Sequence, residues 1–317
     1  MFDIDDTNLS SSLQIKVIGI GGGGISAVNR MIENNLEGVE FIAVDIDSGD
    51  LSNSQAPRRI HITENPKENS KEILNVIEDT DMIFVVAGMG GRAGTSIAPI
   101  IAKYSKELGA LTVAVVACPF ENENRNKNAY NGIEKLRSYA DSVIIISGDK
   151  ILQAGGNISK EQAFSIADEY LKMAVQGISQ LITMPGVVNM DVEDLLNIIG
   201  NSGKASVGVG QASGEKAAMK AAQAALDSPL LENMQNALSV VINIMGAGES
   251  LKMLEVNEAA SLIQDAASVE SEIMWGMSID ESLGDTVRVM IIATRFAGHP
   301  EKFKFVSSSN GSTELPL

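Results

Sequence analysis

Short runs of apolar residues alternate, through the first half of the chain, with segments whose apolar residues recur every three or four positions. The runs predict buried β-strands, and the periodic segments predict helices. Continuous Val and Ile runs separated by helices are typical of a parallel sheet covered on both faces, so we predict an α/β domain here. The expected strands are 15–20, 40–45, 81–87, 111–117 and 142–146, and the expected helices are 69–78, 97–108 and 131–139, with another helix directly after Gly24.

A long helix is predicted to separate this half of the chain from the rest. Its apolar stripe runs from Lys160 to Met184, with Ser159 before it as a cap and Pro185 after it. Beyond it the pattern changes to a smaller α+β arrangement, in which we expect three strands to form a second sheet. Those strands are 239–246, 272–278 and 286–294, and a short strand at 205–209 and helices at 215–226 and 256–269 accompany them.

Two glycine-rich loops follow predicted strands of the first domain. Gly21 to Gly24 come directly after the first strand, and 88–94 follows the third. Glycine allows positive φ and close approach of a ligand, and a helix start offers free N–H groups that suit a phosphate. A tight turn without a ligand is the alternative, but four consecutive glycines cost chain entropy, which favours phosphate binding. Ligands of parallel sheets lie beyond the carboxyl ends of the strands, where both loops fall.

These patterns divide the chain into five segments. We expect a disordered arm at 1–12, a nucleotide-binding domain at 13–158, a central helix at 159–184, a C-terminal α+β domain at 185–296 and a polar tail at 297–317.

Composition restricts the partners. The formal net charge of -17 argues against nucleic acid or an anionic membrane surface. Cys118 is the single cysteine, so an internal disulfide is impossible and a reducing compartment is expected. The first 12 residues are acidic and polar, unlike a signal peptide, and no apolar run reaches the length of a membrane span. We therefore expect a cytoplasmic protein without direct membrane insertion.

One interpretation of the first glycine loop is a dinucleotide site. Gly19, Gly21 and Gly24 fit the spacing G-x-G-x-x-G after a strand, and an acidic pair at Asp45 and Asp47 follows. The match is weak, because any tetraglycine with a glycine two positions upstream contains the pattern. An NAD-dependent oxidoreductase would also need a catalytic centre, and the histidines and Cys118 offer none that stands out. An NAD-dependent oxidoreductase remains the third alternative.

Both glycine loops together resemble those of the FtsZ family, the bacterial relatives of tubulin. The similarity runs from about residue 15 to 294, and its motifs keep the family's order: 15–24, 41–44, 87–91, 112–116, 119–120, 149–150, 174–178, 214–215, 228–231 and 293–294. The resemblance implies a GTP-binding domain, a long central helix and a second domain. It also implies a role in cell division and head-to-tail filaments in which one subunit completes hydrolysis of its neighbour's nucleotide.

The resemblance assigns a nucleotide-binding role to residues in four segments. It implies that Phe164 stacks on guanine, that Asp168 accepts from the guanine N1 and N2 groups, and that Glu123 contacts the ribose. By themselves Phe164 and Asp168 would be an ordinary core residue and surface residue of a helix. The phosphates would be bound by Gly21, Gly22 and Gly23, by Gly90, Gly91, Arg92, Gly94 and Thr95, and by Lys127.

Several positions of this site depart from the family pattern. Ile25 interrupts the glycine run, and Asp45-Ile46 replaces Asn-Thr. In the family the second glycine loop reads Gly-Gly-Gly-Thr-Gly-Thr-Gly. In this chain Arg92 adds a side chain to the loop, and Ala93 lacks a hydroxyl. Lys127 replaces an arginine and loses its bidentate fork. The chain also passes from Ile62 to Asn65-Pro66 without the family's glycine-rich loop beside the terminal phosphate.

The acidic cluster after the long helix keeps the family pattern Asn-x-Asp-x-x-Asp. The resemblance implies that Asn189, Asp191 and Asp194 act on the nucleotide of the neighbouring subunit, where two carboxylates can orient a water. The plain alternative is a helix cap, because acidic residues favour a helix start. Both roles can hold at once.

The sequence therefore predicts a filament-forming protein that binds GTP or GDP, with Mg²⁺ when GTP is bound and no metal site made by protein ligands alone. Hydrolysis is expected to be weak and to be completed by the neighbouring subunit. The alternative is a filament or regulatory subunit that binds nucleotide poorly or not at all. The expected partners are further copies of the chain and a conventional FtsZ.

Overall fold

A single ten-stranded sheet runs through the molecule. The computed structural model describes residues 13–63, 70–121, 123–156, 158–183 and 191–296. The strand order is β3-β2-β1-β4-β5-β6-β7-β10-β8-β9. The expectation of a separate second sheet is wrong, because β6 and β7 pair in parallel from Ser142 with Gly203 to Ile144 with Ala205. The predicted arm at 1–12, the tail at 297–317 and Asn189 lie outside the described residues.

The first half has the alternating β/α order that the apolar pattern predicts. Its strands up to β6 are parallel to their neighbours. The elements are β1 (Ile15–Ile20), α1 (Gly21–Glu33), β2 (Glu40–Asp45), α2 (Ser48–Ser52), β3 (Arg58–His61), α3 (Ser70–Ile77), β4 (Met82–Gly88), α4 (Arg92–Glu107), β5 (Leu111–Cys118), α5 (Asn126–Tyr139), β6 (Ser142–Ser147) and α6 (Gly148–Gly155).

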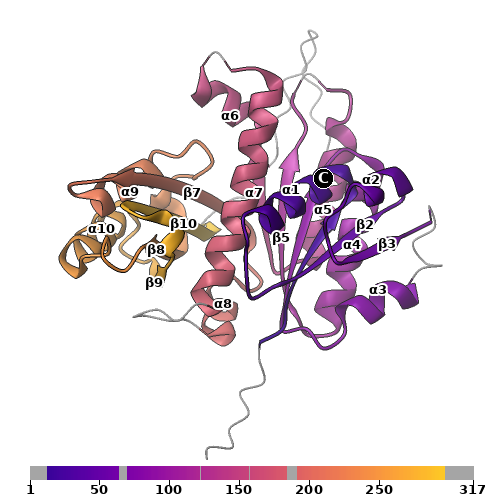
Figure 1. Cartoon of the computed structure of the whole chain (residues 1–317), viewed down its shortest axis with the longest axis horizontal. Coiled ribbons are helices and arrows are strands. Elements are labelled where there is room, and N and C mark those ends of the chain that lie inside the picture. Colours follow the sequence, from indigo (N-terminus) through magenta and orange to yellow (C-terminus); the bar gives the residue numbers. More distant parts are fainter. Residues whose placement is uncertain (1–12, 64–69, 122, 157, 184–190, 297–317) are drawn as a thin grey trace, which may run out of the picture.

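The long helix α7 (Lys160–Thr183) follows and stands between the two groups of elements in Figure 1. Ser159 caps it as predicted, since its hydroxyl accepts from the Gln162 N–H at 3.2 Å. The remaining elements are α8 (Val192–Ile199), β7 (Gly203–Ser213), α9 (Ala217–Leu226), η1 (Met234–Asn236), β8 (Ala237–Gly246), α10 (Met253–Ala266), β9 (Glu272–Ile279), η2 (Glu281–Leu283) and β10 (Thr286–Phe296).

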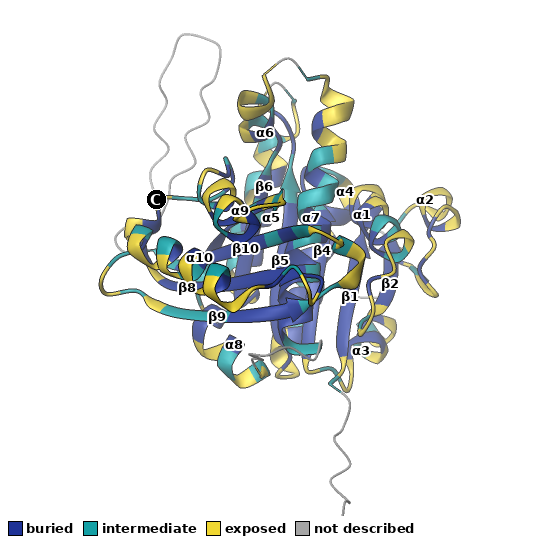
Figure 2. Cartoon of the chain, turned by 60° about the vertical axis from the view of Figure 1, so that its left-hand side comes forward, coloured by how far each residue is buried: buried dark blue, intermediate teal, exposed yellow. Residues whose placement is uncertain are grey.

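Alternate residues of the parallel strands enter two different cores, because successive side chains point to opposite faces of a sheet. Val17, Phe84 and Val113 lie in the core that α1 and α7 cover. Ile18 and Val85 lie in the core on the other face, which α3, α4 and α5 cover. A third core joins β7 to β10 with α9 and α10. Figure 2 shows the strands buried and the outer faces of the helices exposed.

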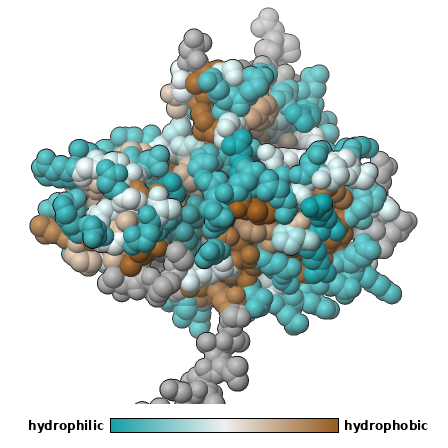
Figure 3. Space-filling model, in the orientation of Figure 1, coloured by the Kyte–Doolittle hydropathy of each residue, from teal (hydrophilic) through white to brown (hydrophobic). Residues whose placement is uncertain are grey.

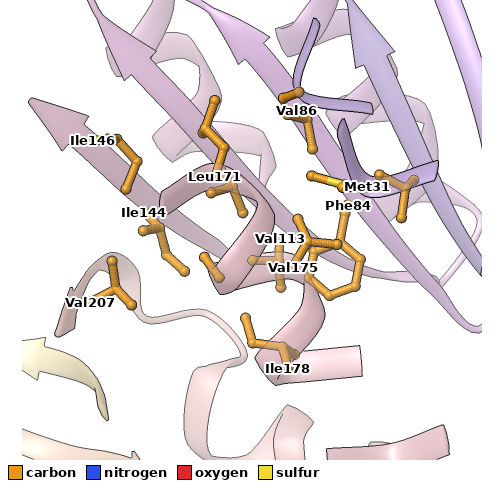
Figure 4. Packing of buried hydrophobic residues seen from close by; sticks show 14 of the residues in the cluster. Met31, Phe84, Val86, Val113, Ile144, Ile146, Leu171, Val175, Ile178 and Val207 are labelled. Atoms are coloured by element: carbon orange, nitrogen blue, oxygen red, sulfur yellow. The ribbon is translucent and has the colours of Figure 1, made fainter. Parts of the chain in front are cut away.

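Helix α7 belongs to the first core for most of its length. Leu171, Val175 and Ile178 are fully buried, and Figure 4 shows them against side chains of the parallel strands. Fully burying such a side chain contributes about 1.5–3 kcal/mol. At its N-terminal end α7 is different, since Phe164 stays 45% exposed although it continues the apolar stripe. Ala163 and Ala167 still bind the first turns of α7 to the core, so only the face that carries Phe164 is open for another role.

The surface seen in Figure 3 is mostly hydrophilic, with smaller hydrophobic areas between. None of the helices in the described part of the chain has the length and hydrophobicity needed to cross a membrane.

Candidate functional site

A cavity of about 380 Å³ lies at the carboxyl ends of the parallel strands β1, β2, β4 and β5. The first turns of two helices, the turn after β2 and one face of α7 surround it. Its lining includes Gly21, Gly22, Gly23, Asp45, Ile46, Asp47, Asp50, Gly88, Met89, Gly91, Arg92, Ala93, Gly94, Ala117, Cys118, Pro119, Arg125, Phe164, Ala167, Asp168 and Leu171.

The tetraglycine is the first turn of α1 rather than a turn before it. The helix begins at Gly21, and its N-cap residue Ile20 has no side chain that could bond the first N–H groups. Gly21 has φ +71, which a residue with a side chain rarely adopts. Gly22 and Gly23 follow it along the cavity wall. Backbone N–H groups and the positive end of a 13-residue helix thus face the cavity, an arrangement that suits a phosphate.

The second glycine loop supplies another helix start at the same cavity. Helix α4 begins at Arg92, five residues earlier than the apolar pattern predicts, and its N-cap Gly91 likewise has no side-chain cap. Gly94 is needed for packing as well, because a Cβ there would lie 2.3 Å from the Gly88 carbonyl oxygen. Gly90 and Thr95 are not among the lining residues; the Gly90 N–H donates to the Thr95 hydroxyl at 2.8 Å and braces the loop.

Helix α7 closes the cavity with one aromatic ring and one carboxylate. The Phe164 ring packs edge-on against Phe120, with centroids 4.8 Å apart and planes at 72°. Asp168, one turn further on, accepts a hydrogen bond from the Ser26 hydroxyl at 3.1 Å and pairs with Arg30 Nε at 3.3 Å. Burial raises the pKa of Asp168, while the Ser26 hydrogen bond and the Arg30 charge oppose that shift. Together these contacts fix the carboxylate at the cavity wall.

Three carboxylates, Asp45, Asp47 and Asp50, lie between the end of β2 and helix α2. Asp47 is the N-cap of α2, and its Oδ1 accepts from the Gly49 N–H at 2.7 Å. Asp45 is only 3% exposed, and its Oδ1 accepts from the Ile46 N–H at 2.6 Å. Burial raises the pKa of Asp45, and the neighbouring Asp50 carboxylate adds to that rise against the lowering effect of backbone hydrogen bonds. This side of the cavity is therefore acidic.

The loop before α5 gives the cavity an arginine that the sequence did not single out. Arg125 lines the cavity and pairs with Glu123 through two bonds, Nε to Oε2 at 3.0 Å and Nη2 to Oε2 at 2.6 Å. Lys127, the predicted cation, is exposed in the first turn of α5 and is not among the lining residues. Glu123 also stays outside the lining but holds Arg125. The signal that could have identified Arg125 is a basic residue four positions before Ala129, the first buried residue of α5.

Cys118 also reaches the cavity, at the end of β5. Burial raises the pKa of its thiol to about 12, and the Asp149 charge adds to the rise while Arg137 opposes it. The thiolate is therefore scarcely populated at neutral pH, which argues against nucleophilic chemistry at this residue.

The acidic cluster after α7 lies away from the cavity. Asp191 is the N-cap of α8, and it forms a capping box with Asp194: Asp191 Oδ1 accepts from the Asp194 N–H at 2.7 Å, and Asp194 Oδ2 accepts from the Asp191 N–H at 3.2 Å. Figure 1 shows α8 at one end of α7 and α6 at the other. Phe164 and Asp168 belong to the end near α6, since α7 begins at Lys160. At 1.5 Å per residue, α7 from Asp168 to Thr183 spans about 22 Å. The two sets of predicted residues are thus on opposite ends of one subunit.

Two family profiles match the chain. The profile for the Tubulin/FtsZ family, GTPase domain, matches residues 14–156, and the profile for the FtsZ family, C-terminal domain, matches residues 203–297. A curated relative, cell division protein FtsZ of Mycoplasmopsis pulmonis, is 40% identical over 338 aligned positions that cover 99% of this chain and 86% of the relative.

Solved structures give the same result. An empty FtsZ dimer from M. jannaschii superimposes with a TM-score of 0.84 at 33% identity, covering 96% of this chain and 95% of the other. A GTPγS-bound CetZ2 protofilament from Haloferax volcanii has a TM-score of 0.74 at 16% identity, with 89% and 92% covered, and shows likeness of fold alone.

Proposed function

The chain belongs to the FtsZ family of tubulin-like proteins, and we propose that it binds guanine nucleotide in the cavity and assembles head to tail into filaments with slow GTP hydrolysis. One observation supports the assignment of a nucleotide site to this cavity. The starts of α1 and α4, neither with a side-chain cap, face one cavity, and an aromatic ring and a buried carboxylate stand on its α7 wall. The domain limits expected above, at 13–158, 159–184 and 185–296, remain part of this proposal.

The phosphates would bind to the N–H groups of the two helix starts. Gly21, Gly22 and Gly23 offer these groups without side chains in the way, and the dipoles of α1 and α4 favour negative charge at this point. Gly90 and Thr95 would support this loop from behind. Arg92 and Arg125 are the cations on the cavity wall, and a guanidinium suits phosphate oxygens. In this arrangement Arg125 takes the role expected of Lys127.

The guanine would lie against α7. Phe164 is exposed enough to stack, and Phe120 holds its ring edge-on from behind. The Asp168 carboxylate can accept from two neighbouring N–H groups of one base edge, and the Arg30 charge opposes the rise of its pKa that burial causes. Adenine presents no such pair of donors, so this carboxylate would select guanine.

Phe164→Ala should weaken GDP binding by about threefold to tenfold, because an aromatic stacking contact is worth about 0.5–1.5 kcal/mol beyond its buried area. Phe164→Tyr keeps the ring and should bind as the unmodified chain does. Isothermal titration with GDP measures both. Equal affinity of the alanine variant would show that the base binds elsewhere.

GTP and GDP should bind with similar affinity. The chain lacks the loop that the family places beside the terminal phosphate, and the Asp45, Asp47 and Asp50 carboxylates add negative charge to the cavity. Residues 64–69, next to that missing loop, lie outside the described part. Competition of the two nucleotides for one labelled GDP analogue tests this prediction, and a GTP preference above about tenfold would contradict it.

Hydrolysis would require a second subunit. Asp191 and Asp194 each use one carboxylate oxygen in the capping box, which fixes both side chains at the exposed end of α8. The second oxygen of each can orient a water against the terminal phosphate of a neighbouring subunit's nucleotide. Asn189 would share this role. Since these residues and the cavity lie at opposite ends of the subunit, head-to-tail stacking brings them together.

The first test is the identity of any nucleotide that the purified protein carries. The chain is denatured, and the released nucleotide is identified by chromatography; GDP or GTP is expected. Sedimentation and phosphate release are then followed after GTP is added. We expect sedimentable filaments that form without obligatory hydrolysis, with slow phosphate release. A folded chain that neither carries nor binds guanine nucleotide would overturn the proposal.

A second candidate is a filament or regulatory subunit without hydrolysis. Two observations favour it: Ala93 removes a hydroxyl from the second loop, and the capping box already gives Asp191 and Asp194 a structural role. Filaments that sediment with GDP as readily as with GTP, and that release no phosphate, would select this candidate over the first.

A further inference from the structure

One carboxylate oxygen on the cavity wall is buried without a partner. Asp45 ends β2, and its Oδ1 accepts from the Ile46 N–H at 2.6 Å and from the Asp47 N–H at 3.2 Å. Its Oδ2 is buried as well and accepts no hydrogen bond from an N–H or O–H donor of the described residues, while the Asp50 side chain lies beside the Asp45 carboxyl. Leaving a charged oxygen buried and unsatisfied is costly, so such an atom calls for a ligand.

A second carboxylate stands beside the first and over the phosphate loop. Asp50, exposed on α2, lies within side-chain hydrogen-bonding range of Asp45, and its charge and this contact both raise the pKa of the Asp45 carboxyl. A Cβ built on Gly22 would lie 2.9 Å from Asp50 Oδ2. The carboxylate therefore lies in contact with the loop where a phosphate is expected, and the two negative groups would repel each other.

We propose that Asp45 and Asp50 bind a divalent cation together with the nucleotide phosphates, so that this chain has a cation site built by its own carboxylates. The inference rests on the proposed nucleotide function and deepens it. Mg²⁺ fits the donor set, since it is held in such sites by one or two carboxylates, phosphate oxygens and water. Asp47 is left out of this pair, because its Oδ1 already accepts from the Gly49 N–H in the cap of α2 and neither of its oxygens is among the buried atoms without a partner.

The site needs the nucleotide to be complete. Among the described residues no three or more His, Cys, Asp or Glu side chains are grouped to hold a metal. Two carboxylates alone bind Mg²⁺ weakly, and the phosphates supply the remaining oxygens. Cation and nucleotide must therefore bind with positive coupling, and each must raise the affinity of the other by the same factor.

The experiment measures this coupling without reference to hydrolysis. GDP affinity of the full chain is determined by calorimetry in EDTA and in MgCl₂, and bound Mn²⁺ is counted by electron paramagnetic resonance with and without GDP. We expect Mg²⁺ to tighten GDP binding by about 5- to 150-fold, and Mn²⁺ to bind only when GDP is present.

Asp50→Asn is the principal variant, since Asp50 is exposed and the change leaves the size of the side chain alone. It should remove the Mg²⁺ effect, abolish Mn²⁺ binding and tighten GDP binding in EDTA, because a repelling charge is gone. Asp45→Asn should also reduce the Mg²⁺ effect on GDP affinity and weaken Mn²⁺ binding. Asp47→Asn is the matched control: it removes the same charge from the same turn, Asn still caps the helix, and the coupling should remain.

Three outcomes would overturn the inference. GDP affinity of the unmodified chain does not change with Mg²⁺, the coupling between Mg²⁺ and GDP persists in Asp50→Asn, or Asp47→Asn loses this coupling as fully as Asp50→Asn does. In each of them GDP still binds, so the proposed nucleotide function stands. A folded chain that binds no GDP in either medium removes the proposed function and this inference with it.

Discussion

Gly24→Ala should strongly destabilise the folded chain. A Cβ at this position would lie 2.3 Å from the Val86 carbonyl oxygen and 3.1 Å from the Gly19 carbonyl carbon. Both are backbone atoms of buried strands, β4 and β1, so no side-chain rotation can relieve the contact. Helix α1 would have to move off the sheet, and the Gly21–Gly23 turn that faces the cavity would move with it.

The expected cost is more than about 3 kcal/mol, at the upper end of overpacking changes. Against a total stability of about 5–15 kcal/mol, this should lower the melting temperature by about 6–12 °C or give insoluble protein. Thermal unfolding followed by circular dichroism measures it. Gly91→Ala is the control, because Gly91 has φ -77 and the nearest atom to its Cβ would be the Gly88 oxygen at 4.0 Å. Equal melting temperatures for the two variants would contradict the prediction.

The parallel strands were predictable because their sequences are nearly pure apolar runs. β1 and β2 have the bounds that the pattern predicts, β4 is shifted by one residue at both ends, and β5 and β6 each end one residue later than predicted. Both faces of these strands are buried, so almost every position must be apolar and the run begins and ends with the strand. The cap of α7 was predictable for a similar reason, since Ser159 and Gln162 form bonds within one turn.

The elements that were missed owe their structure to contacts distant in sequence. β3 is mostly exposed and contains two arginines, so it has no apolar run; its pairing with β2, from Ile42 with Arg58 to Asp45 with His61, makes it a strand. The glycine turns were placed outside helices because glycine lowers helix propensity. Close packing on the strands and ligand access require glycine there instead, as Gly24 and Gly94 show.

The joining of the two halves into one sheet could not be predicted either. β7 extends from Gly203 to Ser213, well beyond the expected 205–209; residues 203–205 pair with β6, and residues 205–213 pair with β10. Glycines at 208 and 210 lower the apparent strand character of the sequence. The structure explains them: a Cβ on Gly210 would lie 2.2 Å from the Ala221 oxygen of α9, which packs directly on the strand.

The candidate site was predictable where it lies on regular elements. Phe164 and Asp168 occupy one face of α7, and the predicted glycines apart from Gly90 lie at two helix starts, so these residues meet at the cavity. Arg125 and Asp50 were missed because they sit on a short loop and a single helical turn, whose direction depends on tertiary contacts. The chemistry of residues such as these cannot be inferred from spacing alone.

Asp191→Asn with Asp194→Asn should abolish the ability of this chain to complete the active site of a neighbour. The assay mixes the chain with a conventional FtsZ whose own two corresponding aspartates have been removed, and it measures phosphate release from the partner's GTP. The unmodified chain should restore release, since its carboxylates lie at the end of the subunit opposite its own cavity. Removing both carboxylates should reduce release by about 10²- to 10⁴-fold, the usual contribution of a positioned acid or base.

The asparagine variants separate catalysis from helix capping. Asn caps a helix about as well as Asp, so α8 should form and co-sedimentation with the partner should persist. Glu193→Gln is the matched control, because it removes a charge from the same turn but from a side chain outside the capping box. If the asparagine variants support release as well as the unmodified chain, Asp191 and Asp194 are a helix cap and nothing more. If the unmodified chain co-sediments yet restores no release, the filament contact does not bring its carboxylates to the partner's nucleotide, and the subunit functions without hydrolysis.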